Sequence, residues 1–152
     1  ESLLLAYRTG IFPWPPDEST LAWFAPKRRA ILRFEDLHVS RSLWKEIRRA
    51  SFSVTINRNF SEVIRRCAEV VNRGNQHGTW ITDGVMEAYE QLHRLGFAYS
   101  VECWAGTSLV GGLYGVTIGR MFGGESMFYR QEGASKIALL TLVKLLVEHG
   151  VE

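Results

Sequence analysis

The sequence predicts a mixed α/β fold of the α+β type, in which a largely antiparallel sheet is flanked by helices. Apolar residues recur at helical spacing through the first part of the chain, whereas from Phe97 to Phe128 they alternate as in strands. A length of 152 residues suits one main core. Apolar residues at 46% and charged residues at 22% exclude a disordered or collagen-like chain.

The first thirty residues differ in amino-acid composition from the rest, and we expect them to form a small lobe. A short helix is predicted over 3–8. Proline and aromatic residues crowd the segment Ile11–Pro16, so that it cannot form a regular helix or a central strand. A short strand is predicted over Ala30–Phe34.

Three helices and a strand are predicted between residues 40 and 96. Ser40 has the side chain of an N-cap for a helix ending at Arg49, and a strand follows over Phe52–Ile56. Asn57 or Asn59 caps the second helix and Thr82 the third. The residues expected to face inward are Leu43, Trp44 and Ile47 in the first helix, Phe60, Val63, Ile64, Cys67, Ala68 and Val71 in the second, and Val85, Met86, Tyr89, Leu92 and Leu95 in the third, which Gly96 ends. The polar run 72–78 is predicted to be a loop.

Three antiparallel strands and a helix complete the predicted order. The first strand spans 97–103, a turn occupies 105–108, the second strand begins at Leu109, and the third covers about 120–128. The segment 134–149 is apolar on most sides, with Thr141, Lys144 and Glu148 on one narrow stripe, so we expect a largely buried helix.

Charge is unevenly divided along the chain. Residues 1–75 contain 13 Lys/Arg against 8 Asp/Glu, whereas residues 76–152 contain 5 against 8. The excess is greatest over 27–49, which is typical of a surface that meets an anionic partner, although a solvated helix face is the alternative.

Composition also limits the cofactors and the location. The two cysteines and four histidines form no cluster with metal-ligand spacing, so we expect no metal and no other cofactor. No apolar run approaches the length of a membrane span and no signal sequence opens the chain. We expect a cytoplasmic protein that acts as a monomer.

The segment 109–128 has the most unusual composition. Six of the fourteen glycines lie here, which indicates bends, bulges or a ligand close to the backbone. Strand alternation places Met121, Gly123, Glu125 and Met127 on one face and Phe122, Gly124, Ser126 and Phe128 on the other. A carboxylate between apolar residues is either a member of a structural ion pair or a functional group in a cleft, so Glu125 remains open between these two interpretations.

The order of these elements also matches the acyl-CoA-dependent N-acetyltransferase (GNAT) architecture. There the N-terminus of the helix that follows the splayed strands binds a diphosphate through a Q/R-x-x-G-x-G/A turn. The segment Gln131–Ala134 is a partial match, and Glu132 would place a negative charge beside the diphosphate. We therefore expect the same scaffold without the coenzyme.

Seven segments, in order, resemble the signatures of the leucyl/phenylalanyl-tRNA–protein transferase family. They are 6–14 (AYRTGIFPW), 38–42 (HVSRS), 78–82 (GTWIT), 100–102 (SVE), 109–115 (LVGGLYG), 124–128 (GESMF) and 134–136 (ASK).

The resemblance implies the domains and the reaction. Residues 1–30 would be the remnant of a small N-terminal domain and residues 31–152 a GNAT-type domain that binds aminoacyl-tRNA. The enzyme would move Leu, Phe or Met from aminoacyl-tRNA to an N-terminal Arg or Lys of an acceptor protein, which marks that protein for degradation by the N-end rule. The alternatives are an acyl-CoA-dependent N-acetyltransferase and an inactive tRNA-binding module.

The resemblance also implies the site residues. Glu125 would be catalytic. The substrate contacts would be Trp14 and Trp80 on the terminal adenosine, Leu113, Phe122, Met127 and Leu139 around the amino-acid side chain, and Gly124 and Ser126. The residues that contact the tRNA would be Arg41, Lys45, Arg48 and Arg49. The family also has a catalytic Asp-Cys-Gln strand at a place beyond Glu152, so we expect this chain to be an inactive part of a longer protein.

Overall fold

The centre of the fold is a four-stranded antiparallel sheet. The computed structural model describes residues 2–17, 19–70, 72–73 and 76–151. The strand order is β3–β6–β7–β8, formed by β3 (Phe52–Ile56), β6 (Ala98–Ala105), β7 (Ser108–Ile118) and β8 (Met121–Tyr129). Glycines with positive φ make the two tight turns, Gly106 between β6 and β7 and Gly119 between β7 and β8. Strands β3 and β8 are therefore the edges of the sheet.

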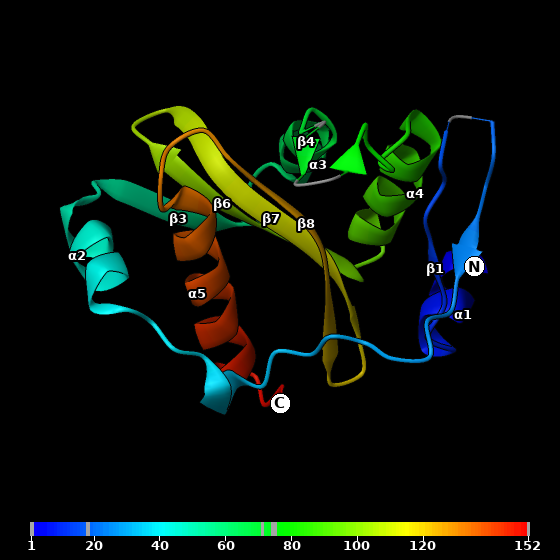
Figure 1. Ribbon diagram of the computed structural model, residues 1–152, viewed down its shortest axis with the longest axis horizontal. Coiled ribbons are helices and arrows are strands. Elements are labelled where there is room, and N and C mark those ends of the chain that lie inside the picture. Colours follow the sequence, from blue (N-terminus) through cyan, green and yellow to red (C-terminus); the bar gives the residue numbers. More distant parts are fainter. Residues whose placement is uncertain (1, 18, 71, 74–75, 152) are drawn as a thin grey trace.

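Helices cover both faces of this sheet (Figure 1). Helix α5 (Ala134–Glu148) packs on one face, and helices α3 (Phe60–Ala68) and α4 (Asp83–Arg94) lie on the other. The α5 layer buries Val101, Leu113, Ala138, Leu142 and Leu146, whereas the α3–α4 layer buries Val63, Ile64, Tyr89, Tyr114 and Val116. The predicted mixed α/β class with an antiparallel sheet is confirmed.

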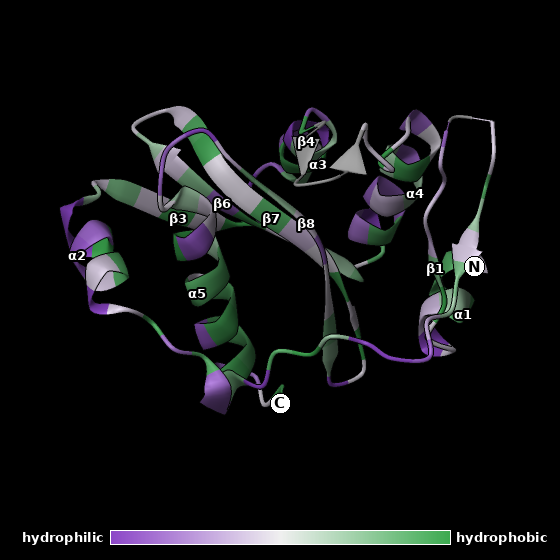
Figure 2. Cartoon of the chain, viewed as in Figure 1, coloured by the Kyte–Doolittle hydropathy of each residue, from purple (hydrophilic) through white to green (hydrophobic). Residues whose placement is uncertain are grey.

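Helix α5 is the apolar helix that the sequence predicts. Figure 2 shows it hydrophobic over most of its length. Its approach to the sheet is close, because a Cβ atom built on Gly111 of β7 would stand 2.5 Å from the Cβ of Ala134. Among the described residues, none of the helices has the length and apolar character that crossing a membrane requires.

The predicted helix caps are confirmed in detail. The side chain of Ser40 accepts a hydrogen bond from the Leu43 amide at the start of α2 (Arg41–Arg49). Asn59 caps α3, and Thr82 caps α4.

The N-terminal segment forms a small lobe beside α4. It contains α1 (Ser2–Arg8) and a short hairpin of β1 (Phe12–Pro13) and β2 (Trp23–Phe24). Residues 25–33 then run without regular structure to the 3-10 helix η1 (Phe34–Asp36), and in the view of Figure 1 this segment crosses β7 and β8 near the turn that joins them, on its way to α2.

Several local predictions are wrong. The segment 30–34 forms no strand, because no described strand pairs with it. Trp44 and Leu95 were expected inside, yet they are 49% and 64% exposed. The predicted loop contains a small hairpin of β4 (Asn72–Arg73) and β5 (Gln76–His77). Helix α3 ends at Ala68, and Val71 lies outside the described residues.

Candidate functional site

A β-bulge on the edge strand determines where Glu125 points. Tyr114 pairs with Ser126 and the next residue, Gly115, pairs with Gly124, so that Glu125 is the extra residue of β8. A bulge interrupts the alternation of faces along a strand, so that Glu125 keeps the face of Gly123 and the residues after it change faces. Glu125 accordingly reaches the α4 side of the sheet, where its carboxylate meets side chains of α1 and α4.

The face assignment from strict alternation is therefore wrong on one side of the bulge. Met127 pairs with Leu113, which packs against α5, whereas Phe128 pairs with Gly112 on the α3 side. Glu125 and Met127 thus lie on opposite faces. Because β8 is an edge strand, both faces remain within reach along the same edge.

Two tyrosines hold the Glu125 carboxylate. The hydroxyl of Tyr7, from α1, donates to Oε1 over 2.6 Å. The hydroxyl of Tyr89, from α4, donates to Oε2 over 3.3 Å, and the two hydroxyl oxygens are 2.5 Å apart. The N-terminal lobe and α4 therefore both contribute to the position of this carboxylate.

The surroundings of the polar cluster formed by Glu125, Tyr7 and Tyr89 change the pKa values of its members. Burial raises the pKa of the Glu125 carboxyl to about 7, although the hydrogen bonds from Tyr7 and Tyr89 and the charge of Arg29 oppose the rise. Burial and the neighbouring carboxylate raise the pKa values of both tyrosines far above the usual range. Glu125 can consequently gain or lose a proton near neutral pH while both hydroxyls keep theirs. Among the described residues, Glu125 forms no ion pair, and the groups that hydrogen-bond its carboxylate are two neutral hydroxyls.

An aromatic stack adjoins the cluster. The rings of Trp14 and Trp80 lie 5.1 Å apart between centroids and 13° from parallel. Trp80 is 5% exposed and meets Tyr89 edge to face at 6.3 Å, whereas Trp14 is 36% exposed. Trp14 is thus the ring of the stack that has exposed surface for a planar ligand.

The residues expected around an amino-acid side chain gather on the other face. Leu113, Phe122 and Leu139 pack in the α5 layer, and Met127 beside them is 39% exposed. They form a partly open apolar surface at the edge of the sheet.

Gly124 and Ser126 flank Glu125 on β8 and have different surroundings. A Cβ atom on Gly124 would meet nothing within 4 Å, so there is open space beside it. The hydroxyl of Ser126 is buried and forms no hydrogen bond with any residue that the structure describes.

The four basic residues of α2 lie on its outer surface. Arg41, Lys45 and Arg48 line a shallow pocket of about 350 Å³ together with the exposed Trp44, and Arg49 is exposed as well. None of these four cations forms an ion pair within the described part of the chain. In Figure 1, α2 lies at the opposite end of the sheet from α1.

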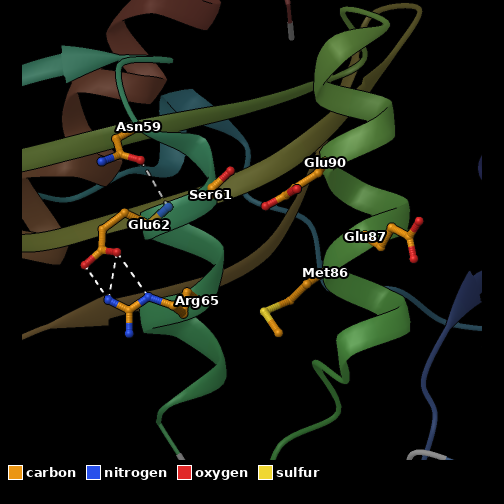
Figure 3. A pocket seen from close by; sticks show the side chains of 7 residues that line it. All are labelled: Asn59, Ser61, Glu62, Arg65, Met86, Glu87 and Glu90. Carbon is orange, nitrogen blue, oxygen red and sulfur yellow. Dashed lines mark hydrogen bonds and ion pairs between the residues drawn. The ribbon is translucent and has the colours of Figure 1, made fainter.

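A second pocket, of about 400 Å³, opens between α3 and α4 and was not predicted from the sequence (Figure 3). Its lining residues are Asn59, Ser61, Glu62, Arg65, Met86, Glu87 and Glu90. Arg65 is already bound to Glu62 over 2.7 Å and to Glu69 over 2.5 Å, and its hydrogen bond lowers the pKa of Glu62. This charge pattern is that of a paired, solvent-facing helix surface.

Acidic side chains lie near the N-terminus of α5, whose first turn also carries the exposed Lys136. Gly133 caps this helix with φ of 81° and no side-chain hydrogen bond. The buried Oε2 atom of Glu46, from α2, stands 3.6 Å from the position that a Cβ on Gly133 would take. Glu132 is exposed beside it. Two carboxylates thus lie where a diphosphate would have to bind.

Among the described residues, no group of three or more His, Cys, Asp or Glu side chains is placed to hold a metal ion. Cys67 and Cys103 are both buried, and burial raises the pKa of the Cys103 thiol to about 11.

Comparison with known sequences gives two family matches. Residues 31–152 match the family model described as leucyl/phenylalanyl-tRNA protein transferase, and residues 1–27 match the one described as its N-terminal domain.

Relatives that carry the name leucyl/phenylalanyl-tRNA–protein transferase include those of three bacteria. That of Syntrophobacter fumaroxidans is 52% identical over 152 residues, which is 100% of this chain and 64% of the relative. That of Idiomarina loihiensis is 47% identical and that of Shigella dysenteriae serotype 1 is 49% identical, each over 148 residues, 97% of this chain and 62% of the relative. The chain spans less than two thirds of the length of these relatives.

Proposed function

The chain belongs to the leucyl/phenylalanyl-tRNA–protein transferase family, and from this premise we propose that it serves the transfer of Leu, Phe or Met from aminoacyl-tRNA to the N-terminal Arg or Lys of an acceptor protein. The acceptor would thereby be marked for N-end-rule degradation in the cytoplasm. The observation that carries the proposal is the position of Glu125, which the bulge places at an open sheet edge between a polar cluster and an apolar surface.

The geometry of the edge suits a 3′-aminoacyl-adenosine. An adenine can stack on the exposed face of Trp14, since stacking on an aromatic side chain is the usual way to bind an unpaired base. The amino-acid side chain can then cross the edge of β8 and contact Leu113 and Met127 on the α5 side. Open space beside Gly124 leaves room for this crossing.

The reaction itself requires positioning and a proton acceptor. An aminoacyl ester is already activated, so that a neutral α-amine can attack its carbonyl carbon, form the amide and release the tRNA hydroxyl. The tasks of the protein are to align the two substrates and to assist removal of a proton from the amine. We assign to Glu125, in its ionised form, the binding of the acceptor's cationic N-terminal residue or its α-amino group near the ester. A pKa near 7 makes that form available at neutral pH.

Residues 31–152 would use a GNAT-type scaffold and residues 1–30 would complete the site from the N-terminal side. An antiparallel sheet followed by α5 agrees with this scaffold. An acyl-CoA would have to place its diphosphate against the N-terminus of α5, where Glu46 and Glu132 would repel it. Aminoacyl-tRNA is therefore the better substrate for this site.

The outer face of α2 would contact the tRNA backbone. Arg41, Lys45, Arg48 and Arg49 are exposed cations without ion-pair partners in the described part of the chain, which is the arrangement that phosphate binding requires.

Glu125→Gln tests the assignment of this residue. The variant should lower transfer of Phe to a peptide beginning with Arg by at least about 100-fold, the size of a lost acid–base or positioning group, while the Kd for aminoacyl-tRNA changes by less than about threefold. Glu87→Gln, an exposed carboxylate on the same helix as Tyr89, is the matched control and should leave both unchanged. If Glu125→Gln weakens tRNA binding as strongly as transfer, the carboxylate is structural. Binding of acetyl-CoA at micromolar concentration by the unmodified protein would favour the N-acetyltransferase instead.

A further inference from the structure

Arg29 is fixed beside the aromatic stack by two contacts. Its guanidinium carbon lies 4.6 Å from the centroid of the Phe12 ring, over the ring face. One terminal nitrogen donates a hydrogen bond to the carbonyl of Gly10. These contacts hold the guanidinium group in one place although the residue as a whole is exposed to solvent.

Among the described residues, Gly10 is the one hydrogen-bond acceptor of this guanidinium. A guanidinium has five N–H groups, and Gly10 takes a bond from only one nitrogen. Within the described residues, no carboxylate lies at ion-pair distance from Arg29.

The position of Arg29 relative to the site is defined on two sides. Phe12, beneath the guanidinium, meets Trp14 edge to face at 6.3 Å between centroids, and Trp14 in turn stacks on Trp80. On the other side, the charge of Arg29 lies close enough to Glu125 to oppose the rise of its pKa. Arg29 is therefore a cation that lies on Phe12, next to the proposed adenine platform, and its charge also acts on Glu125.

We propose that Arg29 binds the phosphate group on the 5′ side of the terminal adenosine of the aminoacyl-tRNA. This inference rests on the proposed function and names a subsite of it. With the adenine on Trp14 and the aminoacyl group near Glu125, the 5′ phosphate is the one anion of that nucleotide, and it lies one sugar away from the base. A planar guanidinium with parallel N–H groups suits two oxygens of a phosphate, and such charge-assisted pairs are the stronger hydrogen bonds of proteins.

The cations of α2 cannot take this role at the same time. They lie at the far end of the sheet from the N-terminal lobe (Figure 1), so they are suited to a more distant part of the tRNA. Arg29 and α2 would thus hold two separate regions of one RNA, the terminal nucleotide and the backbone beyond it.

Two small ligands isolate the contact. One is 3′-phenylalanylamido-3′-deoxyadenosine, whose amide replaces the reactive ester, and the other is the same molecule with a 5′ phosphate. The protein should bind the phosphorylated ligand about 3- to 10-fold more tightly, the range expected for a partly solvated charge-assisted pair. In Arg29→Gln this ratio should fall to about 1, while affinity for the unphosphorylated ligand stays within about twofold. Arg28→Gln, which removes the neighbouring exposed charge, should keep the ratio.

Each outcome of these titrations has a defined meaning. A ratio in Arg29→Gln equal to that of the unmodified protein would overturn the proposal. An equal loss of affinity for both ligands, with the ratio kept, would show that Arg29 only ties its segment to the lobe, and would overturn it too. Arg29→Lys retains the positive charge but lacks the parallel N–H groups of the guanidinium, so it should keep part of the preference for the phosphorylated ligand. This variant provides a second test if Arg29→Gln does not fold. If the unmodified protein binds neither ligand, the proposed function fails; if it binds both equally, only the phosphate subsite fails.

Discussion

Replacing Glu125 by Gln should change how the stability of the protein depends on pH. The carboxyl has a pKa of about 7 in the folded protein against an ordinary value of 4.5, mainly because it is buried, with Tyr7, Tyr89 and the charge of Arg29 opposing the rise. The folded state therefore holds this proton more tightly than the unfolded state does. The resulting stability is fully present below about pH 4.5 and is lost as the pH rises through about 7.

The size of the effect follows from the two pKa values. A difference of about 2.5 units, at about 1.36 kcal/mol each, gives a loss of at most about 3 kcal/mol between pH 4 and pH 8. Because glutamine does not titrate, Glu125→Gln should lack this loss.

Urea unfolding of the unmodified protein and of Glu125→Gln at several pH values between 4 and 8 measures the effect. The difference between their unfolding free energies should change by about 2–3 kcal/mol across this range, in the direction that favours the variant at high pH. Glu87→Gln removes an exposed carboxylate of the same helix layer and should run parallel to the unmodified protein. Parallel curves for Glu125→Gln, within about 0.5 kcal/mol, would refute the reasoning about this carboxyl.

Three further predictions concern the sheet and the surface. Glu102 is 0% exposed and accepts four hydrogen bonds. Glu102→Gln should lower the unfolding free energy of the protein by about 1–3 kcal/mol, because the new amide would point N–H groups at other donors. Urea unfolding curves that match those of the unmodified protein would contradict this prediction. Gly111→Ala should lower the melting temperature through a clash with α5, whereas Gly124→Ala, which meets open space, should not, and equal melting temperatures would remove the packing argument. Arg48→Ala combined with Arg49→Ala should weaken tRNA binding and reduce the slope of log K against log salt by about 1–2, and an unchanged slope would exclude α2 from the interface.

Local signals in the sequence predicted most helices and strands well. Ser40, Asn59 and Thr82 cap their helices because their side chains replace the missing backbone acceptors of a first turn, an effect that needs no tertiary contact. The segment 30–34 shows the limit of such signals. Its apolar composition is typical of a strand, but a strand also needs a neighbouring strand to pair with. The edges of the central sheet are β3 and β8, and neither pairs with this segment.

The site was less predictable than the fold, for two physical reasons. Alternation assumes regular pairing, and the bulge at Glu125 inverts the faces of the residues that follow it. The tyrosine partners of the carboxylate lie 118 and 36 residues away along the chain, and nothing local in their sequence indicates that α1 and α4 meet at β8. The N-terminal lobe was expected to hold the adenosine through Trp14, but its contribution to Glu125 through Tyr7 was not foreseen.

Single-turnover transfer with the protein produced from its complete reading frame tests the central proposal most directly. With labelled Phe-tRNA and excess peptide, label should move to peptides beginning with Arg or Lys and not to the same peptide beginning with Gly, and the Glu125→Gln protein should be at least about 100-fold slower. Transfer that does not depend on the first residue of the peptide, or that is unaffected by Glu125→Gln, would contradict the assignment of Glu125 to the acceptor. No transfer from Phe-tRNA at all, together with acetylation of the peptide from acetyl-CoA, would contradict the proposed function itself.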